Sequence, residues 1–205
     1  MGRDKEIRTM LECLERSENK AITIIGDSGI GKTSIINAFV KEICNNKDEM
    51  LQQVSVVGLN TAKLLAGTSS ENEISQKIVA LIHKLKQIEQ VVLVIDDLQV
   101  LLENGNTGKS TTLINILNAQ IGEGACNLIF TITNDAYRKH IEKQSIESKL
   151  VIINAEELDY STLLCAMYLH KKEIESHYGL EISDDCIPNV IPVSYTHLTL
   201  PTILR

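Results

Sequence analysis

The stretch Gly26-Asp27-Ser28-Gly29-Ile30-Gly31-Lys32-Thr33 fits the pattern G-x-x-x-x-G-K-[ST] at each fixed position. A short apolar run, Ala21 to Ile25, precedes it, and Ser34 to Val40 continues with the spacing of a helix. Glycines let backbone N–H groups wrap around phosphate oxygens, and the N-terminus of the following helix adds a partial positive charge. Strand, loop and helix therefore follow in the order that a phosphate-binding loop requires.

The polar residues of this loop are typical of a nucleoside triphosphate site. Lys32 would reach the β and γ phosphates, and the Thr33 hydroxyl would be a ligand of magnesium. The predicted cofactors are ATP and Mg²⁺. The alternative is a glycine turn that binds nothing, which the preceding strand and following helix disfavour. The predicted nucleotide-binding residues are Gly26, Asp27, Ser28, Gly29, Ile30, Gly31, Lys32, Thr33 and Ser34.

Composition excludes several other classes of function. The 205 residues suffice for one α/β domain or slightly more, and the net charge of −7 argues against binding to nucleic acid or anionic lipid. Aromatic residues make up only 3%, which leaves few side chains to stack on bases. No apolar run could cross a bilayer and no signal peptide is recognisable, so we expect a cytoplasmic protein without a membrane partner. The five cysteines are scattered singly, which suggests neither zinc nor disulfides.

Hydrophobic periodicity predicts alternating strands and helices, and therefore a parallel sheet covered on both faces. Four strands are expected, at residues 21–25, 54–60, 91–95 and 127–134. Helices are expected at about residues 6–16, 34–40, 74–85, 112–120 and 160–177, with Gly179 as a C-cap of the last. Residues 45–53 and 64–70 are expected to be loops. The fold class is α/β, with three layers.

Two acids follow the most apolar strand, Val91 to Ile95. Asp96 stands where a carboxylate that holds magnesium is expected, at the carboxyl end of a buried parallel strand. Asp97 is the candidate that orients or deprotonates the attacking water. Alternatively, the two acids only cap the next element. The later stretch Gly108 to Thr111 imitates a second phosphate loop but lacks its first glycine, since Glu103 stands there.

Four further stretches match sequence motifs of one known family, in the order in which that family has them. Gly2 to Ile7 matches "GRDxEI", Leu64 to Gly67 "LVAG", Asp135 to Lys143 "DEYRKYIEKD", and Tyr178 to Asp184 "HGVRISD". Together they resemble the first AAA+ module of Clp-type ATPases, the hexameric unfoldases and disaggregases, in which the opening motif borders the adenine pocket. By this resemblance Thr133 stands at the sensor 1 position, with Asn134 as the neighbouring possibility.

The resemblance runs from Gly2 to Cys186 and implies a domain organisation. Residues 1–155 would form the AAA+ large nucleotide-binding subdomain, and 156–191 the beginning of the small helical lid. Residues 192–205 resemble a translated adaptor sequence, and we exclude them from the fold. On that interpretation the chain is a fragment of a longer protein; the alternative is a genuine short C-terminal strand.

Three positions differ from the family pattern. The stretch Thr68 to Asn72 lacks the aromatic of the substrate-gripping pore loop. The arginine-finger pattern falls on Ile146 to Leu150, where Lys149 is the one cation, and a lysine lacks the planar fork of arginine. Asp97 replaces the expected glutamate. These differences concern hydrolysis and threading, and leave nucleotide binding untouched.

The leading hypothesis is a Clp-like chaperone module that hydrolyses Mg-ATP and remodels proteins. Lys32, Thr33 and Asp96 would bind Mg-ATP, and Asp97, Thr133 and Asn134 would be catalytic. Its partners would be further copies of itself in a ring-like homo-oligomer, together with protein substrates or adaptors, and no nucleic acid. A second hypothesis is a degenerate scaffold or regulator that binds ATP without threading substrate. A third is a signalling or defence-type P-loop ATPase that resembles Clp only in its core.

Overall fold

The computed structural model describes residues 2–15, 21–46, 48–66, 71–88, 90–103, 110–123 and 127–188. The chain divides into two compact units, one of residues 5–156 and one of residues 1–4 together with 157–205. The adaptor-like tail, residues 192–205, lies outside the described residues, as do residues 68–70 of the expected pore loop. The assignment of a large subdomain and a lid stays a prediction.

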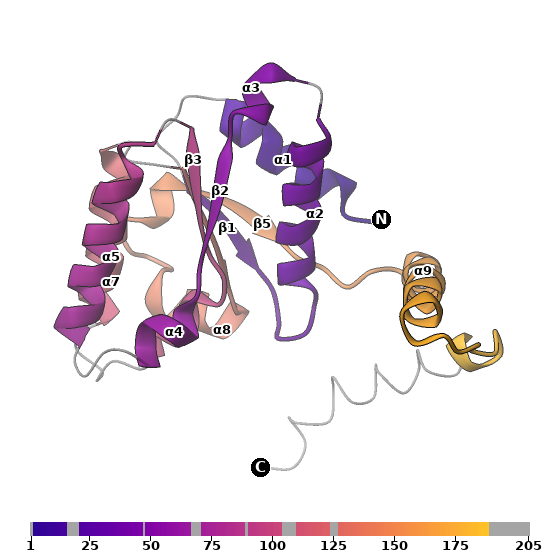
Figure 1. Cartoon of the computed structure of the whole chain (residues 1–205). Coiled ribbons are helices and arrows are strands. Elements are labelled where there is room, and N and C mark those ends of the chain that lie inside the picture. Colours follow the sequence, from indigo (N-terminus) through magenta and orange to yellow (C-terminus); the bar gives the residue numbers. More distant parts are fainter. Residues whose placement is uncertain are drawn as a thin grey trace, which may run out of the picture. The chain divides into compact units, whose positions relative to one another are not determined.

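Five parallel strands form the sheet of the larger unit, in the order β2-β3-β4-β1-β5. Strands β1 and β3 are buried along their whole length, because helices cover both faces of a parallel sheet. Figure 1 shows the sheet between its two helical layers. The predicted α/β fold class is therefore confirmed. The strands are β1 (Ala21–Ile25), β2 (Ser55–Leu59), β3 (Val91–Ile95), β4 (Asn127–Ile132) and β5 (Leu150–Asn154).

Helices α1 and α2 cover one face of the sheet, and α5 and α7 cover the other (Figure 1). In the larger unit the helices are α1 (Asp4–Glu15), α2 (Lys32–Asn45), α3 (Glu49–Gln52), α4 (Thr61–Ala66), α5 (Glu71–Leu85), α6 (Leu98–Glu103), α7 (Ser110–Gly122), α8 (Asn134–His140) and the 3₁₀ turn η1 (Glu147–Lys149). The first residue of α1 is grouped with the smaller unit.

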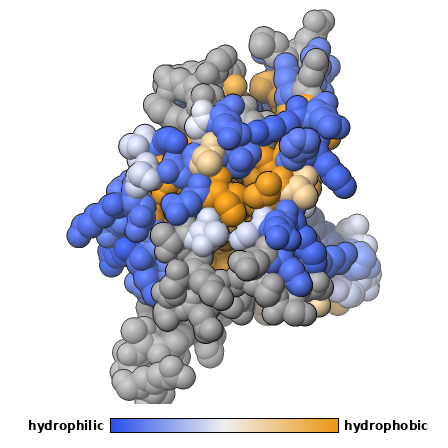
Figure 2. All heavy atoms as spheres, turned by 90° about the vertical axis from the view of Figure 1, so that its left-hand side faces the viewer, coloured by the Kyte–Doolittle hydropathy of each residue, from blue (hydrophilic) through white to orange (hydrophobic). Residues whose placement is uncertain are grey.

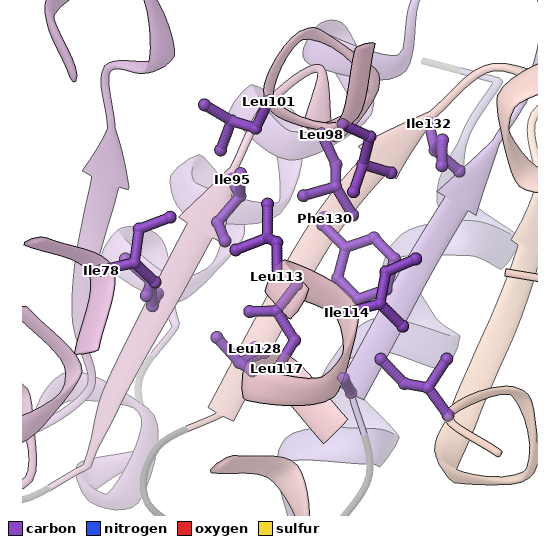
Figure 3. Close-up of a cluster of buried hydrophobic side chains, with 14 of the residues drawn as sticks. Ile78, Ile95, Leu98, Leu101, Leu113, Ile114, Leu117, Leu128, Phe130 and Ile132 are labelled. Carbon is purple, nitrogen blue, oxygen red and sulfur yellow. The ribbon is translucent and has the colours of Figure 1, made fainter. Parts of the chain in front are cut away.

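Alternation along each strand separates the core into two clusters. On β3, Val92 and Val94 pack with α1 and α2, whereas Leu93 and Ile95 pack on the opposite side. Figure 3 shows this second cluster, where Phe130 of β4 lies among side chains of α6 and α7. Each apolar side chain buried in this way contributes about 1.5–3 kcal/mol to folding. Figure 2 shows the α5 side, where hydrophobic atoms near the centre are bordered by hydrophilic residues.

The structure differs from the sequence prediction at several elements. Strand β5 and helices α6 and α8 were not predicted, and α3 lies where a loop was expected. The strand expected at 127–134 ends at Ile132, because α8 begins at Asn134. The loop predicted from Leu64 onward is also wrong, because α4 extends to Ala66. Asn60, predicted as the end of a strand, is instead the N-cap of α4: its side-chain oxygen accepts the N–H of Lys63 at 2.8 Å.

The smaller unit is built around α9 (Tyr160–Tyr178). Asp159 caps its first turn and accepts hydrogen bonds from Ser161 and Thr162, which lower the pKa of its carboxyl group to about 2. Gly179 ends the helix in the left-handed conformation, φ 65°, so the predicted C-cap is confirmed. Gly2 of the GRD motif belongs to the same unit; a Cβ there would meet Thr162 Cγ2 at 2.3 Å. Among the described residues no helix is both long and apolar enough to span a membrane.

Candidate nucleotide-binding site

The glycine loop joins β1 to α2 and is shaped by its glycines. Gly29 and Gly31 adopt φ values of 84° and 96°, a region that side chains disfavour. Gly26 is needed for a different reason, since a Cβ would lie 2.9 Å from Ile30 Cγ2 and 3.0 Å from the carbonyl oxygen of Ala155. Gly31 is the N-cap of α2 and supplies no side-chain cap. The first N–H groups of a 14-residue helix are thus left to bind an anion.

Lys32 is buried at the start of α2, with 6% of its surface exposed. Its ammonium donates hydrogen bonds to the carbonyl oxygens of Gly26 and Asp27, both at 2.9 Å. A buried cation is stable only where such partners surround it. The loop therefore curves around the Lys32 charge, where an anionic ligand would add a stronger partner.

Asp96 contacts the loop directly. Its Oδ2 accepts a hydrogen bond from the Thr33 hydroxyl at 2.7 Å, although the two residues are 63 positions apart. The contact follows from the strand order: β4 lies between β1 and β3, so the loop after β1 and the acids after β3 meet at one edge of the sheet. A carboxylate and a hydroxyl oxygen in contact are ligands that suit Mg²⁺, which is commonly held by one or two carboxylates together with substrate phosphates.

Asp97 lies in the turn after β3, with φ 55°, which is uncommon for a residue other than glycine. Its backbone N–H donates to Thr131 Oγ1 at 2.8 Å, and its Oδ1 accepts from Gln99 Nε2 at 2.8 Å. The Asp97 carboxylate is thus held on one oxygen by a neutral amide. Neither Gln99 nor Thr131 was predicted from the sequence.

Thr133 and Asn134, the two candidates for the sensor 1 position, make different contacts. Thr133 is the N-cap of α8, and its hydroxyl oxygen accepts the N–H of Ala136 at 3.3 Å. Asn134 Nδ2 donates to Asp27 Oδ1 at 2.7 Å. Of the two side chains, Asn134 therefore makes a hydrogen bond to the glycine loop.

The arginine-finger stretch and the Asp135 to Lys143 motif each make hydrogen bonds within the chain. Lys149 Nζ donates to the carbonyl oxygen of Asn118 in α7 at 3.1 Å, so this cation is engaged within its own chain. In the Asp135 to Lys143 motif, the Tyr137 hydroxyl donates to Glu147 at 3.0 Å. Burial, and secondly this carboxylate, raise the pKa of Tyr137 to about 12. Burial also lowers the pKa of His140. The second glycine-lysine stretch, Gly108 to Thr111, begins outside the described residues.

A parallel sheet with this glycine loop between its first strand and the next helix defines an α/β protein of the P-loop NTPase fold. Residues 1–163 match the family model described as nSTAND1, Novel STAND NTPase 1. The chain therefore belongs to the Novel STAND NTPase 1 family.

The resemblance to Clp-type ATPases is also confirmed. The chain is 28% identical over 201 residues to the "ATP-dependent Clp protease ATP-binding subunit ClpC" of Staphylococcus aureus strain USA300, covering 97% of this chain and 25% of ClpC. It is 27% identical, with the same coverage, to "Negative regulator of genetic competence ClpC/MecB" of Bacillus subtilis strain 168. The chain thus spans about a quarter of the length of these relatives.

Solved structures of similar fold include Hsp104 of S. cerevisiae. The "Hsp104-ADP complex" superposes with a TM-score of 0.78 at 26% identity, over 91% of this chain and 32% of Hsp104. The "Hsp104:casein complex, Extended Conformation" gives a TM-score of 0.74, also at 26% identity, over 90% of this chain and 32% of Hsp104. The α/β architecture is therefore that of the AAA+ proteins.

Proposed function

We propose that this chain binds Mg-ATP at the glycine loop and hydrolyses it as a module of a Clp-like protein-remodelling ATPase. The observation that carries the proposal is the 2.7 Å hydrogen bond between the Thr33 hydroxyl and Asp96 Oδ2. It joins the two motifs that hold the nucleotide and its metal in P-loop proteins.

Binding would use groups that surround the start of α2. The first N–H groups of the helix and those of the loop would donate to phosphate oxygens. The Lys32 ammonium would exchange its contacts with the Gly26 and Asp27 carbonyls for the stronger, charged contact with the β and γ phosphates. Mg²⁺, bound together with the nucleotide, would neutralise phosphate charge, and Thr33 and Asp96 are the residues that would hold it.

Hydrolysis would depend on the acid next to the metal ligand. Asp97 would orient the attacking water or accept its proton, using the carboxylate oxygen that Gln99 does not engage. Asn134 is the better placed of the two sensor candidates, because its amide already contacts Asp27 of the loop and Thr133 caps α8. It would link the phosphate state to α8.

The relatives support a role on proteins. The structures of similar fold include Hsp104 with ADP, with ATPγS and with casein. By this similarity the full-length protein would form a ring-like homo-oligomer and act on protein substrates or adaptors. A cytoplasmic location also stays a prediction.

Lys149 favours a second candidate function, a regulator that binds ATP without threading substrate. A residue that completes a neighbouring subunit's site must extend from its own surface. Lys149 Nζ instead donates to the Asn118 carbonyl within the chain. Nucleotide binding alone would then control assembly or signalling.

Measurement of phosphate release by the 205-residue chain and by Asp97→Ala and Lys32→Ala separates the two candidates. The ATPase proposal predicts release that exceeds Lys32→Ala and falls by about 10²-fold or more in Asp97→Ala, with ATP affinity retained. Tight ATP binding, with release no faster than in Lys32→Ala, would contradict hydrolysis and favour the regulator. Absence of ATP binding would contradict both.

A further inference from the structure

Thr131 is a polar residue in an apolar strand. It lies on β4 between Phe130 and Ile132, and its side chain is completely buried. A buried hydroxyl costs free energy unless it is hydrogen-bonded. Thr23 of the adjacent strand β1 is also completely buried, but its hydroxyl has no partner within the described part of the chain. The two threonines are thus buried in neighbouring strands, face opposite sides of the sheet, and differ in their hydrogen bonding.

The directions of the Thr131 hydrogen bonds follow from the atoms involved. A backbone N–H can only donate, so Thr131 Oγ1 accepts from Asp97 N–H at 2.8 Å. The single hydroxyl proton is then directed to Asp96 Oδ1, 2.7 Å away. One side chain therefore contacts both acids that follow β3.

The hydrogen bond from the Thr131 hydroxyl to Asp96 Oδ1 fixes the Asp96 carboxylate. Thr131 engages Oδ1 and the Thr33 hydroxyl engages Oδ2, so each of the two oxygens has its own partner. Rotation of the carboxylate would break both bonds. Oδ2 is consequently the oxygen that faces the loop, where the metal of a bound Mg-nucleotide would lie.

The hydrogen bond from the Asp97 N–H to Thr131 Oγ1 fixes the backbone of Asp97. A positive φ at this residue stores about 1–2 kcal/mol of strain, which a hydrogen bond to its N–H helps to offset. Release of that bond would let the turn relax and shift the carboxylate that Gln99 holds.

We propose that Thr131 is a positioning residue that orients the metal-facing oxygen of Asp96 and the turn at Asp97 through its one hydroxyl group. The inference rests on the proposed Mg-ATP function. Loss of a residue that orients a metal ligand by a hydrogen bond typically lowers metal affinity by about 10- to 100-fold. A purely structural threonine would change stability and leave the magnesium requirement as it is.

A magnesium titration tests this role. Binding of a fluorescent ATP analogue to the full chain is followed as Mg²⁺ is raised, and ADP affinity is measured separately in EDTA. Thr131→Val removes the hydroxyl, Thr131→Ser retains it, and Thr23→Val makes the same exchange at the threonine without a partner. The expected midpoint in Mg²⁺ rises about 10- to 100-fold in Thr131→Val and less than about 3-fold in the other two, with ADP affinity in EDTA unchanged throughout.

Equal midpoints for Thr131→Val and Thr23→Val would overturn the proposal, as would an equal loss in Thr131→Ser. If Thr131→Val does not fold by circular dichroism, Thr131→Ala serves as the hydroxyl-free variant under the same criteria. Failure of the underlying function is visible beforehand, because the unsubstituted chain would then show no magnesium-dependent nucleotide binding.

Discussion

Three glycines of the larger unit should respond differently to the same substitution by alanine. At Gly58, in the edge strand β2, a Cβ would meet nothing within 4 Å. Alanine also reduces the conformational entropy of the unfolded chain, so Gly58→Ala is expected to stabilise by about 0.5–1 kcal/mol.

Gly31→Ala should destabilise through the backbone alone. The nearest atom to a Cβ would be Ser34 Cβ at 3.8 Å, so space is available, but φ is 96°. A side chain in that region costs about 1–2 kcal/mol, and the entropy gain returns about 0.4–1 kcal/mol. The expected net loss is about 0–1.6 kcal/mol.

Gly26→Ala should be the most damaging of the three. Its Cβ would lie 2.9 Å from Ile30 Cγ2, and 3.0 Å from both the Cβ and the backbone oxygen of Ala155. Overpacking of this kind costs about 1–3 kcal/mol, and the backbone oxygen cannot move aside as a flexible side chain could. The expected order of stability is therefore Gly58→Ala, unsubstituted, Gly31→Ala, Gly26→Ala.

Thermal unfolding followed by circular dichroism measures this order. For a chain of this length, 1 kcal/mol corresponds to a change in Tm of about 2–4 °C. Gly58→Ala should thus raise the Tm by about 1–4 °C, and Gly26→Ala should lower it by about 2–12 °C. Stabilisation by Gly31→Ala, or a Gly26→Ala variant as stable as the unsubstituted chain, would refute the reasoning about the loop.

Two further variants test contacts around the site. Lys149→Ala should lower the free energy of unfolding by about 1 kcal/mol, because the hydrogen bond to the Asn118 carbonyl is lost. As a control, Lys84→Ala at an exposed lysine should change it by less than about 0.5 kcal/mol. Unchanged stability of Lys149→Ala combined with lost hydrolysis would instead indicate that Lys149 acts on a neighbouring subunit. Because the pKa of Tyr137 is raised to about 12, the fold favours its neutral form, and the stability this gives is present below pH 10 and lost between about pH 10 and 12. Urea unfolding should show a smaller decline over this range in Tyr137→Phe, and identical pH dependence would contradict the assignment.

The parts of the fold that the sequence predicts best are those with a single strong signal. The continuous apolar run from Val91 to Ile95 became β3 with the predicted bounds, since a strand buried on both faces needs apolar residues throughout. Strand β5 was not predicted because it is a short edge strand of mixed burial: Ile152 is 42% exposed, whereas Ile153 is buried.

In the candidate site, too, the residues with a clear sequence signal were predicted and the others were not. The loop from Gly26 to Thr33 was predicted from local spacing, and Asp96 from its place after a buried strand. Thr131 and Gln99 could not be predicted, because their roles depend on the strand order and on the φ of Asp97. The spacing of residues along the sequence reveals neither. A lone threonine within an apolar strand was the only signal.

Calorimetric titration of ATP into the 205-residue chain with Mg²⁺ present tests the central claim most directly. The account predicts saturable binding to one site per chain, weakened about 10- to 150-fold in Lys32→Ala, the value of a charged hydrogen bond of about 1.5–3 kcal/mol. Lys41→Ala, at an exposed lysine of the same helix, should bind as the unsubstituted chain does. No heat of binding, or equal affinity in Lys32→Ala, would contradict a nucleotide site at this loop.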